Sequence, residues 1–214
     1  MSVVIQHKNI RVVTFQKCGH TSIINMFQTP ADQAINRGAS PNVYVSKDEE
    51  APVFYKGTDT DDWPDAEITI AFFRNPLQRA YSAYQHFIIR TLSNELVSVP
   101  SLGRKQFTEL GFTAGMTFLE FCEHLKTVDL DYDPHLRPQI TSFVAAKSGF
   151  DIINQLENIH RSWPELVEDF NMSCTKAVVY FNSANYDPWP EDSLEGHIIR
   201  SLYDEDYHTW DMAL

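Results

Sequence analysis

The fold of this chain follows from the stretch Val12-Val13-Thr14-Phe15-Gln16-Lys17-Cys18-Gly19-His20-Thr21-Ser22. The run from Ile10 to Phe15 is rich in apolar and β-branched residues, which is the composition of a buried strand. After a short turn, apolar residues return at helical spacing, at Ile23, Ile24, Met26 and Phe27. The stretch therefore predicts a strand that passes through a tight, glycine-containing turn into the N-terminus of a helix.

This turn has the features of an anion-binding site. Backbone N–H groups at the start of a helix point into the turn, the helix dipole adds positive potential, and Lys17 adds a full charge. A phosphate or sulfate group is the ligand that suits such a turn. The same residues are also compatible with an ordinary strand–helix turn that carries one exposed lysine.

A second strand is predicted over Ile68–Phe73, and it ends in Arg74-Asn75-Pro76. Pro76 suits the first turn of a helix. We expect that helix to run to about Arg90, with one face formed by Leu77, Tyr81, Tyr84 and Ile88.

Arg74 lies at the C-terminal end of this predicted strand, which is where open α/β sheets place ligand-binding groups. Ser82 follows about two helical turns later. A guanidinium and a hydroxyl arranged in this way can share one phosphate. The alternatives are a capping or ion-paired arginine and a serine on an ordinary helix face.

The composition indicates one α/β domain over residues 1–214, because 43% of the residues are hydrophobic and can fill a full core. The chain has no apolar run of about 18 residues that would span a membrane. Residues 1–8 lack the apolar segment of a signal peptide. Three scattered cysteines suit a reducing compartment. We therefore expect a cytoplasmic protein of a bacterium or a virus.

The net charge of −12 argues against general nucleic-acid binding, which needs a basic face. It does not argue against one basic pocket for a small anion. Most carboxylates lie outside the candidate turn, in residues 48–50, 59–65 and 191–206, where we expect solvated loops and helix faces.

The remaining segments give weaker signals. Residues 28–52 predict loops, with a short helix over 32–36 and a short strand over 43–45, and a second short strand is expected at Val53–Tyr55. Residues 91–116 contain Pro100 and three glycines, so a long loop is expected, either a lid or an insertion.

Three further helices and one strand are expected toward the C-terminus. Thr117-x-x-Glu120 is a capping box that predicts a helix to about Leu125, and Ser162-x-x-Glu165 predicts another to Phe170. Residues 177–181 suggest a late strand. The apolar stripe of a C-terminal helix is formed by Leu194, Ile198, Ile199 and Leu202.

The segment Asp133-Pro134-His135-Leu136-Arg137-Pro138-Gln139 contains several groups able to do chemistry. His135 is a candidate general base and Arg137 a candidate contact to an anion. Gln139 is a candidate hydrogen-bond donor that would orient a bound acceptor substrate. A proline-braced turn with a surface histidine is the alternative.

Several of these segments resemble motifs of the sulfotransferases. Gln16–Ser22 is similar to the 5′-phosphosulfate loop, and Arg74–Tyr84 is similar to the 3′-phosphate motif R-[DN]-P-x-x-R-x-x-S-x-Y. Three segments resemble the Golgi-type carbohydrate sulfotransferases in the same order: Asp133–Gln139, Phe150–Asn158 and Leu202–Tyr207. The chain departs from the pattern at Gln16, where proline is common, and at the bulky His20.

The resemblance implies a P-loop-like, three-layer α/β fold with a mainly parallel central sheet flanked by helices. It implies transfer of a sulfuryl group from 3′-phosphoadenosine 5′-phosphosulfate (PAPS) to a hydroxyl of a carbohydrate or another small acceptor, without a metal. Lys17 and His135 would be catalytic, as the cation at the leaving oxygen and as the base. The donor would be bound by Lys17, Cys18, Gly19, His20, Thr21, Ser22, Arg74 and Ser82.

Two other functions remain compatible with parts of the sequence. A P-loop nucleotide kinase needs G-x-x-x-x-G-K-[ST] and an acidic partner for Mg²⁺. Here Lys17 precedes Gly19 and the loop has no second glycine. A non-catalytic nucleotide-binding protein of the same fold is the second alternative.

Overall fold

The computed structural model describes residues 2–7, 9–15, 17–27, 53–57, 65–93, 101–140, 150–172, 174–178 and 187–213. The chain forms two compact units. The first, called here the sheet unit, comprises Met1–Arg74, Gln139–Ser183 and Thr209–Leu214. The second, called the helical unit, comprises Asn75–Pro138 and Ala184–His208. The expectation of one domain over the whole chain stays a prediction.

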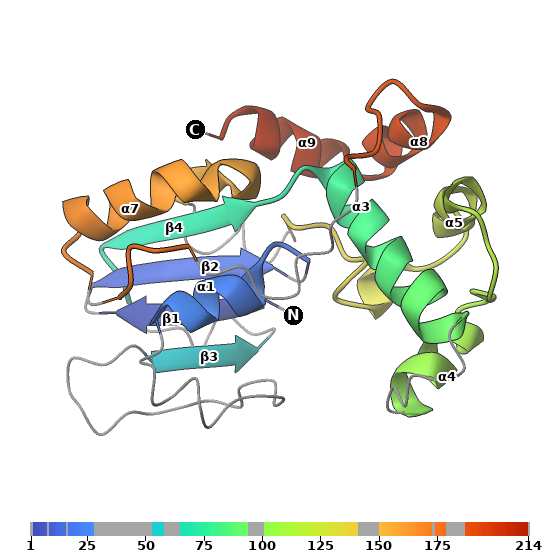
Figure 1. The fold of residues 1–214 in the computed structure, drawn as a ribbon, viewed down its shortest axis with the longest axis horizontal. Helices are drawn as coiled ribbons and strands as arrows, with labels where there is room; N and C mark the ends of the chain where they lie inside the picture. Colours follow the sequence, from blue (N-terminus) through green and yellow to red (C-terminus); the bar gives the residue numbers. More distant parts are fainter. Residues whose placement is uncertain are drawn as a thin grey trace. The chain divides into compact units, whose positions relative to one another are not determined.

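The sheet unit contains a five-stranded sheet in the order β3-β1-β2-β4-β5 (Figure 1). Its strands are β1 (Ser2–His7), β2 (Ile10–Phe15), β3 (Val53–Gly57), β4 (Ile68–Phe73) and β5 (Ile152–Gln155). The pairs β2–β4 and β4–β5 are parallel, whereas β1 runs antiparallel to both β2 and β3. Four strands therefore share one direction, which confirms the predicted α/β fold with a mainly parallel sheet.

The register of the parallel strands positions the candidate turn. Thr14 of β2 pairs with Phe72 of β4, so the two strands end at the same edge of the sheet. Because ligand groups gather at the carboxyl edge of parallel strands, the residues that follow Phe15 and Phe73 lie where a binding site is expected.

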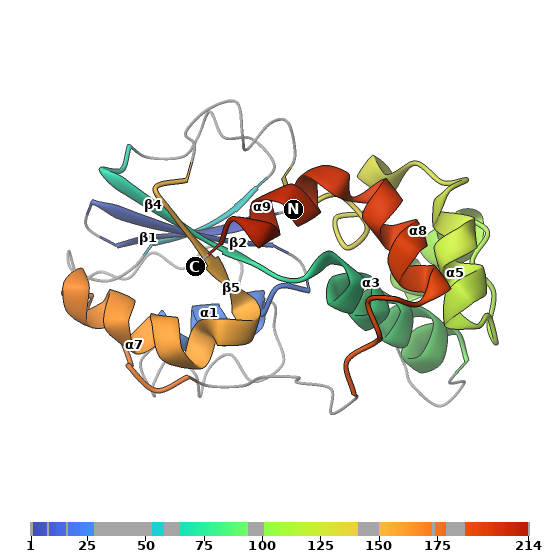
Figure 2. The same cartoon turned by 90° about the horizontal axis from the view of Figure 1, so that it is seen from above.

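Both faces of the sheet are covered, and side chains alternate between them along each strand. On one face, Val12 and Phe72 pack with α1 (His20–Phe27) and with Trp163 of α7 (Ile159–Asp169). Figure 2 shows α1 and α7 on this same side of the sheet. On the other face, a cluster of Val13, Phe15, Cys18, Ala71 and Phe73 packs with Ile140, Phe150, Ile153 and Trp210.

The helical unit is built around α3 (Pro76–Tyr84), which continues as the π-helix η2 (Gln85–Leu92). Its other helices are α4 (Ser101–Glu109), α5 (Phe118–Leu125), the short η3 (Leu130–Tyr132), α8 (Leu194–Leu202) and the first part of α9 (Asp204–Asp211). The predicted face of Leu77, Tyr81, Tyr84 and Ile88 packs into the core of this unit, with Phe118 and Phe121 of α5.

Most of the predicted helices and strands are confirmed, including the strands Ile10–Phe15 and Ile68–Phe73 with their predicted ends. The capping box of Thr117 and Glu120 is present at the start of α5. The expected helix over 32–36 and strand over 43–45 lie outside the described residues, as do residues 179–181 of the expected late strand.

Two predictions are wrong. Residues 91–116 are not one long loop, because α4 occupies Ser101–Glu109. Pro100 precedes that helix, and burial of Phe107 stabilises it despite Gly103. The helix predicted to open at Ser162 begins earlier, at Ile159. Burial of its apolar face, formed by Ile159, Trp163, Leu166 and Val167, outweighs the lost hydrogen bond of Pro164 inside the helix.

The predicted C-terminal helix with the stripe of Leu194, Ile198, Ile199 and Leu202 is confirmed as α8, and Tyr203 separates it from α9. Every helix in the described part of the chain is too short or too polar to cross a bilayer.

Candidate functional site

The turn after β2 is tightly bonded to its own strand and helix. The Cys18 N–H donates to the Phe15 carbonyl at 3.0 Å, and the Thr14 hydroxyl donates to the Cys18 carbonyl at 3.1 Å. The Ile23 N–H donates to the Gly19 carbonyl at 2.9 Å, which starts α1. The strand thus passes into a helix N-terminus within a few residues, as a phosphate-binding turn requires.

Gly19 is required by this geometry. Its φ of +69° lies in the left-handed region that favours glycine. A Cβ at this position would also lie 2.8 Å from Leu156 Cδ1, which is closer than real Cβ contacts. Any other residue at position 19 would therefore be strained by the positive φ and would displace the Leu156 side chain.

Lys17 has a left-handed backbone as well, with a φ of 64°, although it carries a side chain. Lysine is rare in this region, and such residues concentrate at functional sites where the surrounding structure holds them. Lys17 is half-buried, and its carbonyl accepts a hydrogen bond from Arg74 Nη1 at 3.0 Å. Arg74, the predicted 3′-phosphate arginine, therefore stabilises the strained turn.

Arg74 directly follows β4 and is half-buried. Its backbone N–H donates to Gln139 Oε1 and its carbonyl accepts from Gln139 Nε2, both at 2.8 Å. Cys18 Sγ lies 2.7 Å from the same Oε1. The sheet unit thus brings together Lys17, Cys18 and Arg74 from the predicted donor site.

Gln139 differs from its prediction, whereas the place of Cys18 in the donor-binding loop stays a prediction. Both side chains are fully buried, and both are engaged with each other. Gln139 is therefore not a contact to an acceptor, because its amide is used on the backbone of Arg74. The Cys18 thiol likewise faces the core, so this residue contributes to the turn through its backbone.

The rest of the predicted loop lies in the first turn of α1. Ser22 is buried, and Thr21 is half-buried, with a carbonyl that accepts from Asn25 Nδ2 at 2.6 Å. The side chain of His20 lies outside the described part of the structure. Placement of the positive end of α1 beside Lys17 gives this turn the polarity that an anion needs.

Ser82 lies in the helical unit, half-buried on α3. That helix begins as the sequence predicts, because Asn75 Oδ1 caps it by accepting from the Gln78 N–H at 3.0 Å and Pro76 occupies the first helical position. The sharing of one phosphate by Arg74 and Ser82 stays a prediction.

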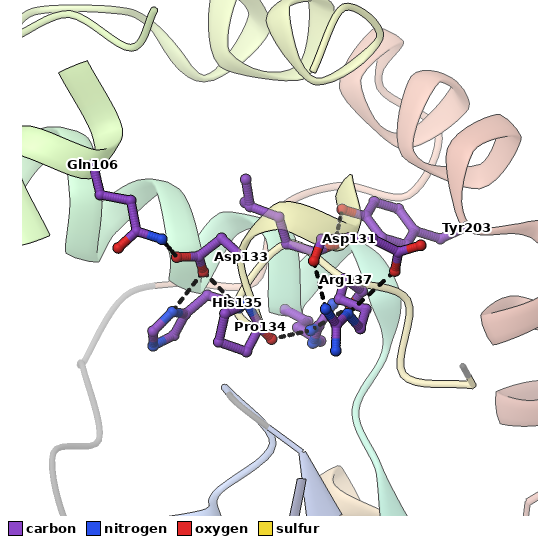
Figure 3. Close-up of polar contacts among 9 residues, drawn as sticks. Gln106, Asp131, Asp133, Pro134, His135, Arg137 and Tyr203 are labelled. Carbon is purple, nitrogen blue, oxygen red and sulfur yellow. Dashed lines mark hydrogen bonds and ion pairs between the residues drawn. The ribbon is translucent and has the colours of Figure 1, made fainter. Parts of the chain in front are cut away.

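The helical unit also contains His135, whose ring is directed at the carboxylate of Asp133 (Figure 3). Asp133 Oδ1 lies 2.8 Å from His135 Nδ1 and accepts the His135 backbone N–H at 2.7 Å. Its other oxygen accepts from Gln106 Nε2 at 3.1 Å. Burial acts to raise the pKa of Asp133, but the hydrogen bonds and the charge of His135 outweigh it, so this pKa is lowered.

The Asp133 contact determines which ring nitrogen of His135 can act as a base. An ionised carboxylate only accepts hydrogen bonds, so Nδ1 carries the proton. The neutral ring then accepts a further proton at Nε2. The His135 side chain is 27% exposed, whereas that of Asp133 is 5% exposed. A buried carboxylate thus orients a partly exposed histidine, the arrangement that activates general bases in many enzymes.

The backbone turn that carries His135 is held by one side chain from α3 and one from the junction between α8 and α9. Arg79 of α3 is buried and donates through Nη2 to the carbonyls of Pro134 and Arg137, at 3.3 Å and 2.7 Å. The Tyr203 hydroxyl donates to the Leu136 carbonyl at 2.6 Å. Burial raises the pKa of Tyr203, so its hydroxyl remains a donor at all ordinary pH values.

Arg137 forms an ion pair with Asp131, with 3.1 Å between Nε and Oδ1. Sequence reasoning missed the positioning roles of Asp133, Arg79 and Tyr203. Asp133 and Arg79 lie inside the two motifs Asp133–Gln139 and Arg74–Tyr84. The signal that could have identified their roles is their charge, because charged side chains are rarely buried without a partner.

No group of three or more histidine, cysteine or acidic side chains suited to a metal ion occurs among the residues that the structure describes. Comparisons with curated proteins and with solved structures gave no match. The model of the sulfotransferase family matches residues 2–186. Because this match covers most of the 214 residues, the chain belongs to the sulfotransferase family, whose reaction is the transfer of a sulfuryl group.

Proposed function

We propose that the protein transfers a sulfuryl group from PAPS to a hydroxyl of a carbohydrate or another small acceptor. The observation that carries the proposal is the contact between Arg74 Nη1 and the Lys17 carbonyl, at 3.0 Å. This contact supports the proposal, because Arg74 is the predicted 3′-phosphate arginine and Lys17 belongs to the predicted 5′-phosphosulfate turn. Two cationic side chains at the carboxyl edge of the sheet suit a nucleotide with two anionic groups.

In this proposal the turn binds the 5′-phosphosulfate and Arg74 with Ser82 binds the 3′-phosphate. Lys17 and the first backbone N–H groups of α1, from Gly19 to Ser22, hold the phosphosulfate oxygens. One functional domain over residues 1–214 is part of the proposal.

The reaction is an in-line displacement at sulfur. A bond forms between the acceptor oxygen and sulfur, and the bond between sulfur and the bridging oxygen breaks, which leaves adenosine 3′,5′-bisphosphate. Negative charge grows on the bridging oxygen, where Lys17 and the loop dipoles stabilise it. The acceptor hydroxyl gives its proton to His135 Nε2, and Asp133 stabilises the imidazolium that forms.

Donor binding can be tested with adenosine 3′,5′-bisphosphate and AMP. The bisphosphate should raise the melting temperature clearly more than AMP does, because only it has a 3′-phosphate. At about 100 times its dissociation constant a ligand stabilises by roughly 2.7 kcal/mol. Equal shifts with both nucleotides would remove the basis for this donor.

Turnover needs a separate measurement. Purified protein should be incubated with donor labelled in the sulfuryl group and a panel of neutral sugars, and label transfer should be followed in a single turnover. Transfer to a hydroxylated acceptor supports the proposal. Bisphosphate binding without transfer to any member of a broad panel would point instead to a non-catalytic nucleotide-binding protein.

A further inference from the structure

Gln139 is a buried glutamine that joins the two donor-binding segments of the sheet unit. Its Oε1 accepts from the Arg74 backbone N–H, and its Nε2 donates to the Arg74 carbonyl. The same Oε1 accepts from the Cys18 thiol. One side-chain amide therefore contacts residues that are 65 and 121 positions away in the sequence.

The pairing with Arg74 continues the hydrogen bonding of β4 beyond its last residue. The strand ends at Phe73, which pairs with Gln155 of β5. At the next residue the Gln139 amide satisfies both backbone groups, as a peptide of a neighbouring strand would. The backbone from which the Arg74 guanidinium extends is therefore held in one position.

A closed circuit of contacts results. It runs from Gln139 through the Arg74 backbone and guanidinium to the Lys17 carbonyl, and it returns from the neighbouring Cys18 thiol to Gln139. Removal of the amide would open this circuit at two places at once. The bond from Arg74 Nη1 to the Lys17 carbonyl would remain, but the Arg74 backbone would lose its link through Gln139 to the Cys18 thiol.

We infer that Gln139 is a positioning residue that sets the spacing between the Lys17 turn and Arg74, and with it the preference for nucleotides that carry both a 5′- and a 3′-phosphate. The inference rests on the proposed function, which assigns these two segments to the two ends of the donor. A ligand with one phosphate engages one segment and is insensitive to their spacing. A bisphosphate must match both, and small misplacements of paired binding groups are costly.

The test compares dissociation constants of adenosine 3′,5′-bisphosphate and AMP for the wild type and for Gln139→Met. Methionine has a similar size and shape but makes none of the three hydrogen bonds. The preference for the bisphosphate, taken as the ratio of the two constants, should fall about tenfold or more. A loss shared equally by both nucleotides would show a merely structural role and would overturn the inference.

Gln139→Glu provides a second, nearly isosteric test that does not depend on the methionine variant folding. A protonated carboxyl offers one donor and one acceptor like the amide, whereas an ionised one only accepts and would face the Arg74 carbonyl. Relative to the wild type at the same pH, the preference should be restored at about pH 5 and lost at about pH 8, since burial raises a carboxyl pKa. The Cys18 thiol and the cations of Lys17 and Arg74 are unchanged in this variant. A wild-type preference at both pH values would overturn the inference.

Gln155 is the matched control, because it is a half-buried glutamine of the same unit. Its Nε2 donates to the Trp210 carbonyl at 3.3 Å and its Oε1 accepts from Asn158 Nδ2 at 3.0 Å. Gln155→Met and Gln155→Glu should keep the wild-type preference.

A wild type that does not prefer the bisphosphate overturns the proposed function together with this inference. A wild-type preference that persists in both Gln139 variants overturns the inference alone.

Discussion

At the scale of single residues, Lys17 combines a cationic side chain with a left-handed backbone. We expect Lys17→Ala and Lys17→Gly to lower turnover equally, by about 10²–10³-fold, because both remove the charge that stabilises the leaving oxygen. Glycine should leave the protein about 1 kcal/mol more stable than alanine, because only alanine keeps the strain of a positive φ. Single-turnover rates and urea unfolding of the two variants measure these effects.

The comparison separates two roles of Lys17. If both variants keep the maximal rate and lose only bisphosphate affinity, Lys17 binds the donor and does not act in the transition state. A glycine variant that is active while the alanine variant is inactive would show that the backbone of this turn, rather than the amine, is what matters.

His135 is the proposed base, and Asp133 orients it. We expect His135→Ala to lower turnover by about 10²–10⁴-fold while donor affinity stays near wild type. The wild-type rate should rise with pH as the histidine loses its proton, and the variant should lack this rise. His197→Ala is a suitable control, since His197 is an exposed histidine of the same unit.

This assignment can fail in a specific way. If His135→Ala is nearly as active as the wild type and His20→Ala is inactive, then the base lies in the phosphosulfate loop. A shared loss of activity in His135→Ala and His86→Ala would point to the ring pair that these residues form, with centroids 6.2 Å apart.

The lowered pKa of Asp133 predicts that this residue stabilises the folded protein less as the pH becomes acidic. Its lowered pKa means that the folded protein favours the carboxylate more than the unfolded chain does. The stabilisation is therefore complete above the unfolded value, about 3.9, and is lost as the pH falls through the lower folded value. Melting temperatures of the wild type and Asp133→Asn, compared between about pH 2 and pH 6, should converge at the acid end. Curves that stay parallel throughout would contradict this role.

At the scale of elements, the junction between α8 and α9 stabilises the candidate site. Tyr203 of this junction donates a hydrogen bond to the turn that carries His135. We expect Tyr203→Phe to lower the free energy of unfolding by about 1–3 kcal/mol, since it leaves the carbonyl of the buried Leu136 without this donor. Urea unfolding measures the loss. Tyr132→Phe is the control, because Tyr132 is 52% exposed and should change stability little.

At the scale of the whole molecule, the net charge of −12 bears on the acceptor. Repulsion from such a surface acts against polyanions, so we expect neutral or lightly charged sugars to be better acceptors than heavily sulfated chains. Turnover of matched neutral and sulfated oligosaccharides, measured over a range of salt concentrations, tests this expectation. Faster transfer to sulfated chains that declines as salt rises would contradict it and would point to a local basic path, for which the exposed Arg90 and Lys105 are candidates.

Local sequence patterns were sufficient to predict the elements that carry the donor-binding residues. The apolar run at Ile10–Phe15 and the turn residues at Lys17 and Gly19 predicted β2 and the start of α1 with correct bounds for the strand. The same was true of Ile68–Phe73 and the proline after it. These predictions succeeded because strand composition, turn chemistry and helix caps act between residues close in sequence.

Long-range contacts could be found only in the tertiary structure. Gln139 was predicted to contact an acceptor, yet it is buried against Arg74 and Cys18, which are far from it along the chain. The turn that carries His135 is likewise held by Arg79 of α3 and by Tyr203 between α8 and α9, which are far from it along the chain. Sequence periodicity does not tell which distant carbonyl will accept a hydrogen bond from a buried amide, guanidinium or hydroxyl. The packing of the whole unit decides which polar groups are buried next to one another and must pair.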